Sequence, residues 1–359
     1  MFIELTLLIM TSAIIAWLAT RAVIHFAPRI GLVHQPNHRS SHVKVTPHGG
    51  GIGIIISTLF FTAWLLWRDE SSHFSYYWIA VGLSLIVALI GLLDDIYHLS
   101  AKLRLFVQFA VSSALLITLY TIPANGLDPI AILPVWLSFI LVLFAGTWWL
   151  NLFNFMDGID GLAAIQTIFM LSGAAFLIAT VSLDVSITTT VWVWMLCLSA
   201  ATIGFLIHNW SPATIFMGDV GSLFLAFMIL FLALLTISLK WMTYTSWVIL
   251  GAVFISDTSI TLLRRIIKGE AVTQAHNSHA YQILARRWGA HKKVSLLVLL
   301  INITWLLPCA YLALLFPQQS MYWMVLSYFP LLLGVGWLSQ SKTSFDKEKC
   351  RATLSRDTR

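Results

Sequence analysis

Eleven long apolar stretches separated by short polar connections constrain this chain more than any other feature. A stretch of about 20 mostly apolar residues crosses a bilayer as an α-helix. The chain is 59% hydrophobic and 10% charged, with a mean hydropathy of +0.86, which excludes an ordinary soluble domain. The sequence therefore predicts an all-α polytopic membrane protein with about 11 transmembrane helices, over roughly residues 3–27, 50–67, 76–93, 103–121, 131–150, 161–181, 188–207, 221–238, 242–263, 294–316 and 321–339.

The distribution of basic residues predicts the orientation of these helices. The first stretch has no basic residue before it, and no small-residue cleavage pattern precedes Arg21 and His25 near its end, which is unlike a cleaved signal peptide. With the N-terminus outside, all of the 21 Lys and Arg residues except Arg68 and Lys240 fall on the inner side or at its boundary. We therefore expect a multi-pass protein of a bacterial inner membrane, with a periplasmic N-terminus and a cytoplasmic C-terminus.

No soluble domain separates the apolar stretches, because the longest polar connection runs only from Arg264 to Lys293. We expect a single integral membrane domain over residues 1–340 and a basic, disordered cytoplasmic tail over residues 341–359. The pI near 9.3 then reflects topology and attraction to anionic lipid head groups. Nucleic-acid binding is excluded, since no basic, aromatic-bearing soluble face is present.

Five carboxylates stand at the ends of apolar stretches, and with this topology all of them lie on the cytoplasmic side. They are Asp94, Asp95, Asp157, Asp160 and Asp219. A charge close to the bilayer core is costly, so it is seldom kept there without a role. Acidic groups that converge at one interface favour a hard cation and a phosphate-bearing substrate.

The connection after the third stretch holds Asp94 and Asp95, followed by Lys102 and Arg104. An acidic pair beside Lys102 offers a metal ligand, a base and a cation that keeps the carboxylates ionised. The alternative is an interfacial helix end whose charges are simply hydrated. The pair alone does not decide between these interpretations.

The motif NLFNFMDGIDG is more specific. Asn154, Asp157 and Asp160 recur every three residues and would share one face if the turn is helical. Gly158 and Gly161 permit a tight backbone beside each carboxylate. A plain connection between helices has no need for this spacing, so we favour a functional role.

Two further connections supply candidates for substrate binding. Asp219, between two glycines in FMGDVGS, is either a functional carboxylate or only a helix N-cap. Asn209 and Phe216 suit a planar base, through amide hydrogen bonds and ring stacking. The first connection, with Lys44 and a glycine run, could meet phosphate or could be a positive-inside loop entering a helix.

Two histidines in the last polar connection, His276 and His279, are three residues apart and compatible with one helical face. Metal ligation is open, but the surrounding basic residues better suit an anionic phosphate. Asp257, in the ninth stretch, lies one helical turn before Thr261 and about two turns before Arg264. We favour a structural ion-pair partner over a catalytic group for this carboxylate.

In chain order, LDDIYHLSAKLR, NFMDGIDG, FMGDVGS and SHAYQ resemble the motifs of the polyprenyl-phosphate N-acetylhexosamine-1-phosphate transferases of glycosyltransferase family 4. That family includes the phospho-MurNAc-pentapeptide translocase and the undecaprenyl-phosphate GlcNAc-1-phosphate transferases. The resemblance covers nearly the whole chain, and the SHAYQ ending is most similar to the branch that initiates lipopolysaccharide O-antigen. It implies transfer of a sugar 1-phosphate from a UDP-N-acetylhexosamine to undecaprenyl phosphate, with release of UMP.

The resemblance also implies roles for individual residues. Asp219 matches the Mg²⁺ ligand, with Asp94 as a second candidate and Mn²⁺ as an alternative ion. Asp94 and Asp95 match the pair that binds metal or activates the lipid phosphate, and Lys102 matches the cation that faces this phosphate. Asn154, Asp157 and Asp160 match the loop near the sugar and nucleotide. Asn209 and Phe216 match the uracil-binding positions, and His279 matches a histidine at the sugar phosphate. We expect Lys44, Arg104 and His276 as further substrate-binding residues.

The chain departs from the family pattern after His279, where Ala280, Tyr281 and Gln282 replace the clustered histidines of many members. The sugar is therefore open between GlcNAc and 6-deoxy relatives such as FucNAc or QuiNAc. Rival classes are a secondary transporter with intramembrane carboxylates and a non-catalytic scaffold for glycan assembly. The chain could also form a homodimer. The reaction could proceed in two steps through an aspartyl-phosphate intermediate, but we favour direct attack of the lipid phosphate on the UDP-sugar.

Overall fold

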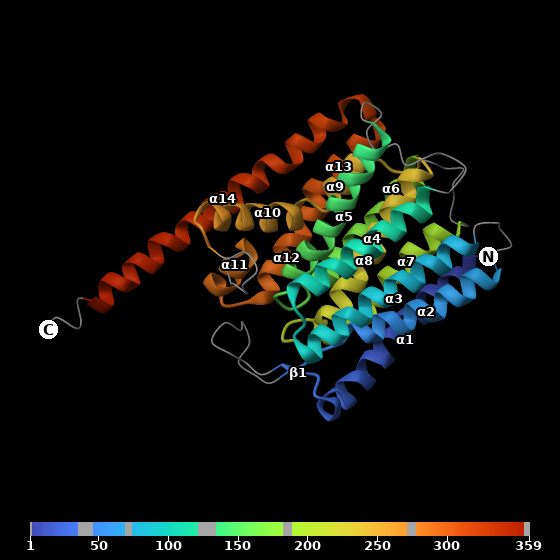
Figure 1. Ribbon diagram of the computed structural model, residues 1–359, viewed down its shortest axis with the longest axis horizontal. Helices are drawn as coiled ribbons and strands as arrows, with labels where there is room; N and C mark the ends of the chain where they lie inside the picture. Colours follow the sequence, from blue (N-terminus) through green and yellow to red (C-terminus); the bar gives the residue numbers. More distant parts are fainter. Residues whose placement is uncertain are drawn as a thin grey trace.

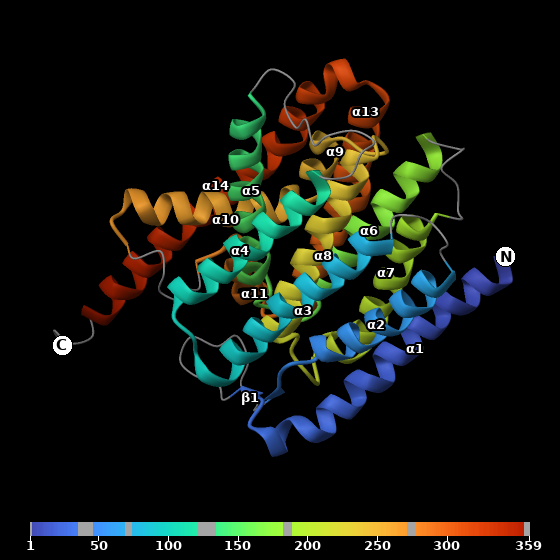
Figure 2. The same cartoon turned by 45° about the vertical axis from the view of Figure 1, so that its right-hand side comes forward.

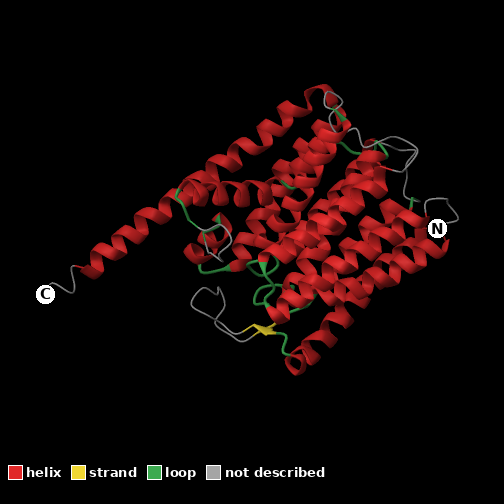
Figure 3. Ribbon diagram, viewed as in Figure 1, coloured by secondary structure: helices red, strands yellow, loops and turns green. Residues whose placement is uncertain are grey.

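The computed structural model describes residues 2–34, 46–68, 74–120, 134–181, 189–270 and 278–354, and helices dominate these ranges (Figure 3). In chain order they are α1 (Phe2–Phe26), α2 (Gly51–Arg68), α3 (Phe74–Tyr97), α4 (Ala101–Tyr120), α5 (Val135–Met156), α6 (Leu162–Val181), α7 (Thr190–Asn209), α8 (Gly218–Ser238), α9 (Tyr244–Leu250), α10 (Ala252–Ile267), α11 (Ala280–Trp288), α12 (His291–Ile301), α13 (Leu307–Leu315) and α14 (Ser320–Leu354). Short 3₁₀ turns at Ala27–Ile30 and Pro317–Gln319, a π-helical turn at Asn302–Leu306, and a small antiparallel pair, β1 (Val33–His34) and β2 (Thr46–Pro47), complete the described elements.

The predicted transmembrane helices have counterparts in the structure. Within the described residues, 9 helical segments are long and apolar enough to cross a membrane, and α9 with α10 makes a tenth candidate, bent by 75°. The apolar part of α2, Gly51–Trp67, is shorter. These segments correspond to the predicted stretches one by one, which confirms an all-α polytopic membrane protein. The side of the membrane on which each terminus lies stays a prediction.

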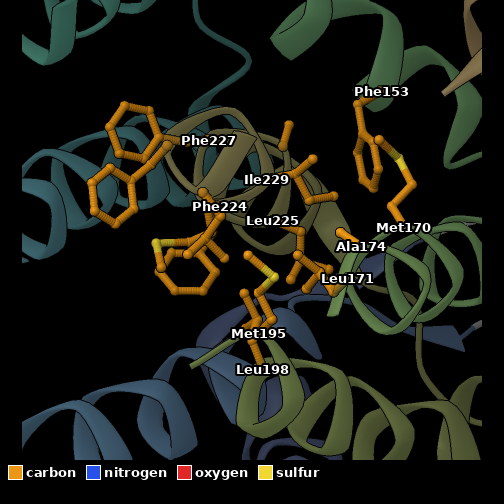
Figure 4. Close-up of a cluster of buried hydrophobic side chains, with 14 of the residues drawn as sticks. Phe153, Met170, Leu171, Ala174, Met195, Leu198, Phe224, Leu225, Phe227 and Ile229 are labelled. Carbon is orange, nitrogen blue, oxygen red and sulfur yellow. The ribbon is translucent and has the colours of Figure 1, made fainter. Parts of the chain in front are cut away.

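Helix α8 forms the centre of the bundle, with α2, α3, α5 and α6 packed against it (Figure 2). Its sequence is apolar on every side, which is the pattern of a helix buried all round. Phe224 and Phe227 of α8 lie in a cluster with Phe153 of α5, Leu171 of α6 and Leu198 of α7 (Figure 4). This core fixes the position of the α8 N-terminus.

Helices α2 and α8 approach each other through glycine. A Cβ added to Gly51 would lie 2.1 Å from the Cα of Gly221, so no larger residue fits at this crossing. The backbone N–H of Gly51 donates to the carbonyl of Met217 at 3.0 Å. The glycine run of the first polar connection therefore serves the approach of a neighbouring helix.

The C-terminal helix α14 packs against α9, α10 and α13, and only its last part extends away from the bundle (Figure 1). It continues as helix to Leu354. The expectation of a disordered tail from residue 341 is therefore wrong for residues 341–354, although a domain boundary near residue 340 stays a prediction. Pro330 lies within α14 without ending it.

One end of the bundle carries the polar connections predicted to be cytoplasmic. The ends of α3, α5 and α7, the starts of α4, α6 and α8, and β1 lie at this end (Figures 1 and 2). The chain returns to this end after each pair of long helices. Residues far apart in the sequence are thereby placed side by side.

Candidate active site

A cluster of polar side chains lies where α3, α4, α5 and α8 meet at this end of the bundle. Arg104, in the first turn of α4, places Nη1 against Oδ2 of Asp94 and 3.4 Å from Oδ2 of Asp219. Asp94 lies in the last turn of α3 and Asp219 in the first turn of α8. Two carboxylates from distant parts of the chain thus share one guanidinium nitrogen.

Asp95, the second member of the acidic pair, has a different environment. Its Oδ1 accepts a hydrogen bond from the backbone N–H of Asp219 at 3.0 Å, and its Oδ2 accepts one from Val220 at 3.2 Å. Both N–H groups belong to the helix N-terminus, where no intrahelical acceptor exists. Asp95 therefore caps α8 from the end of α3, and Asp219 is not the cap of its own helix.

Asn154 connects α5 to the same face of α8. Its Nδ2 donates to Oδ2 of Asp219 at 3.1 Å, and its Oδ1 accepts from Oγ of Ser222 at 3.2 Å. One turn earlier on α5, Asn151 donates to Oε1 of Gln108 on α4 at 2.6 Å. Polar contacts therefore hold the three helices together around Asp219.

Asp157 directly follows α5, and its N–H donates to the carbonyl of Asn154 at 3.2 Å. The side chain is half-buried. Burial, with the negative charges of Asp219 and Asp95 next in importance, raises the pKa of Asp157 well above its ordinary value. The charge of Asp157 therefore depends on which cations are bound nearby.

The three polar residues of NLFNFMDGIDG do not share one helical face, contrary to expectation. Helix α5 ends at Met156, and the chain turns before α6 begins. Asp160 is only 4% exposed, accepts from the N–H of Ala213 at 3.3 Å, and lies 3.4 Å from Nδ1 of His291. Asp160 thus ties the α5–α6 connection to α12 and to the α7–α8 connection.

Asn209 and Phe216 were predicted to bind a planar base. Both ends of the Asn209 amide are bonded to backbone: Oδ1 accepts from Gly161 N at 2.9 Å, and Nδ2 donates to the carbonyl of Ile215 at 2.9 Å. This geometry gives Asn209 a structural role and no support for a contact with uracil. The N–H of Phe216 donates to the carbonyl of Pro47 at 2.9 Å, and stacking on its half-buried ring stays a prediction.

His279 is the N-cap of α11 and is only 2% exposed. Its Nδ1 lies 3.3 Å from Oδ1 of Asp257, a carboxylate that also accepts from the backbone N–H groups of Ala280 and Tyr281. Asp257 was predicted to be a structural ion-pair partner. Its charged neighbour in the structure is His279, while Arg264 donates to a carbonyl of α14, so the structural role is retained and Arg264 is not the partner.

Lys102 and Arg104 lie in positions that do not match their predicted roles. Lys102 is exposed, and Arg104, two positions further on, makes the contact with the acidic cluster. Lys102 was predicted to hold the carboxylates ionised, and Arg104 takes that position. Lys44 and His276 lie outside the described residues, so their predicted contacts with substrate stay untested.

Three residues near the site were not singled out from the sequence. His48 places Nδ1 3.7 Å from Oδ1 of Asp95, and Ser222 bonds to Asn154. His48 and Ser222 each lie next to a predicted motif, so their position in the sequence could have indicated that they belong to the site. His291, which contacts Asp160, has no such local signal because it begins a helix in a distant part of the chain.

The donor set near Asp219 fits a hard divalent cation. Within the described ranges, no group of three or more His, Cys, Asp or Glu side chains is arranged as a ready metal site. Asp94 and Asp219 nevertheless offer carboxylate oxygens that already share one cation, the guanidinium group of Arg104. Proteins commonly hold Mg²⁺ through one or two carboxylates, with waters and substrate phosphates completing the shell.

Fold and site together define a class: a polytopic membrane protein with a partly buried acidic cluster and one arginine at the end of its bundle. Such a cluster suits phosphate chemistry at the membrane surface, because carboxylates recruit the cations that phosphates require. It is less suited to ion transport along the bundle, since the described acidic residues of the site lie near one end.

Comparisons with known proteins agree with this class. Residues 77–237 match the family model described as glycosyl transferase family 4. The chain is 31% identical over 316 residues to the probable undecaprenyl-phosphate N-acetylglucosaminyl 1-phosphate transferase of Bacillus subtilis, covering 84% of this chain and 82% of that protein. It is 33% identical over 241 residues to the decaprenyl-phosphate N-acetylglucosaminephosphotransferase of Mycobacterium tuberculosis, with 63% and 59% covered. It is 28% identical over 286 residues to the undecaprenyl-phosphate alpha-N-acetylglucosaminyl 1-phosphate transferase of Yersinia pestis, with 76% and 75% covered.

The chain belongs to glycosyl transferase family 4, among the polyprenyl-phosphate N-acetylhexosamine-1-phosphate transferases. The family resemblance predicted from the motifs is thereby confirmed. The chain is accordingly a membrane transferase.

Proposed function

We propose that this protein transfers a sugar 1-phosphate from a UDP-N-acetylhexosamine to undecaprenyl phosphate and releases UMP. The observation that carries the proposal is the meeting of Asp94, Asp219 and Arg104 at one end of a membrane bundle. A water-soluble nucleotide and a lipid phosphate can both reach such a site. By the positive-inside rule this end faces the cytoplasm, where UDP-sugars are available.

The chemistry is direct attack of one phosphate on another. An oxygen of the lipid phosphate forms a bond to the β-phosphorus of the UDP-sugar, and the bond from that phosphorus to the bridging oxygen breaks. UMP leaves with the bridging oxygen, and the product is a sugar diphosphate lipid. The lipid phosphate is mostly ionised near neutral pH, so the reaction needs little help from a general base.

The main demand on the protein is therefore compensation of negative charge. Asp219 and Asp94 would hold Mg²⁺, with Mn²⁺ as the alternative, and the bound ion would neutralise the diphosphate and the leaving group. Arg104 supplies a further positive charge at the same place. Asn154 orients the Asp219 carboxylate, and Asp95 fixes the helix that carries it.

The names of the relatives indicate which sugar this protein transfers. Those compared above act with N-acetylglucosamine and a polyprenyl phosphate, so GlcNAc is the first sugar to test here. FucNAc and QuiNAc follow, because the SHAYQ connection departs from the histidine cluster of many members. We also propose that the product initiates a lipid-linked envelope glycan such as O-antigen. Homodimer formation stays a prediction.

A reconstituted assay separates this function from its rivals. Purified protein in phospholipid vesicles is given UDP-GlcNAc, Mg²⁺ and undecaprenyl phosphate, and UMP and lipid products are measured by mass spectrometry. A transferase produces UMP and a sugar diphosphate lipid in equal amounts. Substrate flux without new bonds would instead indicate a transporter, and neither signal would indicate a scaffold. Repeating the assay with UDP-FucNAc and UDP-QuiNAc identifies the sugar.

A further inference from the structure

A buried carboxylate in a membrane helix, Asp257 of α10, has no part in the chemistry above. It is only 3% exposed, and a buried charge is costly unless it is hydrogen-bonded. Its Oδ1 accepts from the N–H of Ala280 at 2.8 Å, and its Oδ2 accepts from the N–H of Tyr281 at 2.9 Å. Oγ1 of Thr261, one turn along α10, donates to Oδ1 at 3.2 Å. The carboxylate is thus bonded mainly to the first turn of another helix, α11.

We propose that Asp257 is a positioning residue for the transfer reaction, which holds the N-terminus of α11 and so seats His279 and Tyr281 against the end of α5, beside Asp157. The inference rests on the proposed function. Asp257 acts through α11 and does not itself meet the substrate.

Tyr281 connects α11 to the last turn of α5 and to Gly158, on either side of Asp157. Its hydroxyl donates to the carbonyl of Phe155 at 2.9 Å, and its side chain is 3% exposed. A Cβ added to Gly158 would lie 2.1 Å from this hydroxyl oxygen, so the glycine beside Asp157 makes room for Tyr281. Burial raises the pKa of Tyr281, which keeps the phenol protonated as a donor.

His279 is fixed by the same arrangement. Its Nδ1 lies 3.3 Å from Oδ1 of Asp257, and its ring stacks on Tyr281 with centroids 5.6 Å apart. His279 and Gln282 also form a reciprocal capping box at the start of α11. The Nδ1 edge of the ring faces the Asp257 carboxylate, so His279 would meet a phosphate through Nε2.

Helix α11 needs such an anchor because it is short. It has 9 residues, fewer than the roughly 12 to 15 that an isolated helix requires in water. Its hydrophobic side packs on α12 and α14, while Asp257 supplies acceptors for two N–H groups of the first turn. Loss of the carboxylate should loosen the start of α11 before it affects the membrane core.

The first test compares Asp257→Asn with Thr258→Val in the reconstituted transfer assay. The amide introduced by Asp257→Asn is isosteric with the carboxylate but offers one acceptor oxygen in place of two. We therefore expect kcat to fall about 10- to 100-fold, with KM for the UDP-sugar nearly unchanged. Thr258 is a matched control, because its buried hydroxyl has no hydrogen-bond partner in the described part of the chain. We expect Thr258→Val to retain wild-type kcat.

The second test measures position rather than activity. In hydrogen–deuterium exchange, Asp257→Asn should speed exchange across residues 278–288 and leave α8 unchanged. Tyr281→Phe should lower kcat in the same way. The double variant Asp257→Asn/Tyr281→Phe should be no slower than Asp257→Asn alone, because both substitutions disrupt the same connection from Asp257 through α11 to the end of α5.

Wild-type kcat and wild-type exchange in Asp257→Asn would overturn the inference, as would additive losses in the double variant. If Asp257→Asn does not fold, Tyr281→Phe decides, since an unchanged kcat would overturn the path through α11. If the wild-type protein transfers no sugar from any of the three UDP-sugars, that result would contradict the proposed function and not the role of Asp257 in holding α11. The exchange measurement would then still show whether Asp257 holds α11.

Discussion

Adjacent acidic residues can carry different tasks when a helix ends between two partners. Successive residues on a helix point about 100° apart, so Asp94 and Asp95 cannot face the same group. Asp94 meets Arg104 in the acidic cluster, while Asp95 accepts from two N–H groups of α8. One carboxylate is thus available for chemistry and the other holds the scaffold.

This difference predicts that the same substitution, Asp to Asn, lowers mainly stability at Asp95 and mainly kcat at Asp94. Asp95→Asn removes one acceptor from the α8 N-terminus and should lower stability by about 1–3 kcal/mol. Asp94→Asn should keep the wild-type Tm within a degree or so but lower kcat about 100-fold. Thermal unfolding in detergent and the transfer assay measure both effects. Equal losses of Tm would contradict the assignment.

Asp157 predicts a pH dependence of stability. Its folded pKa is raised by burial above the ordinary value of about 4. Its contribution to stability is therefore fully present below the unfolded pKa and is lost as pH rises through the folded pKa. With divalent cations removed, Asp157→Asn should abolish this decline and unfold at a higher Tm than wild type at neutral pH. Parallel Tm curves for the two proteins across pH 4 to 8 would refute this prediction.

The residue types of the site could be predicted from the sequence, but their partners could not. Their position at the ends of apolar stretches indicated that Asp94 and Asp219 lie at one interface, and the family resemblance placed Asn154 near the substrate. All three are close together in the structure. The choice of Arg104 over Lys102 depends on helix register, and the choice of acceptor for Asp95 depends on how α3 meets α8. Neither is encoded in a local pattern.

At the scale of elements, small residues decide how closely helices approach. Gly51→Ala would place a Cβ 2.1 Å from the backbone of Gly221, so α2 and α8 would have to separate. We expect a loss of stability of about 1–3 kcal/mol or more, together with lower kcat, since Asp219 lies on α8. Gly82→Ala is the control: a Cβ there has nothing within 4 Å, and the substitution should be neutral or stabilising. Equal Tm values for the two variants would contradict the packing.

Helix existence was easier to predict than helix shape. The sixth stretch, predicted over residues 161–181, is α6 at Leu162–Val181. The ninth stretch read as one helix over residues 242–263, yet α9 and α10 meet at 75° around Gly251. Hydropathy measures the length of an apolar run. It does not sense a bend at one glycine that surrounding helices stabilise.

At the scale of the whole molecule, charge distribution predicts which end of the bundle faces the cytoplasm. Lys240 and Lys268 are both exposed in the structure but lie on opposite sides of the predicted membrane. A membrane-impermeant maleimide should label Lys240→Cys in spheroplasts of intact cells and label Lys268→Cys only after the membrane is opened. The reverse pattern would invert the topology and place the candidate site outside.

The convergence of distant connections is what gives the molecule one site. Described parts of all five polar connections touch at this end, through contacts such as His48 with Asp95 and His291 with Asp160. Alternating direction of the long helices explains why such residues return to the same end. It does not explain which connections are adjacent, because that depends on packing around α8.

The most direct measurement is Mg²⁺-dependent transfer from UDP-GlcNAc to undecaprenyl phosphate by wild-type protein and by Asp219→Asn. We predict UMP and a sugar diphosphate lipid from the wild type. The variant should turn over about 1000-fold more slowly while its Tm stays at the wild-type value. Near-normal Mg²⁺-dependent turnover by Asp219→Asn would contradict the claim that this carboxylate is the centre of the site.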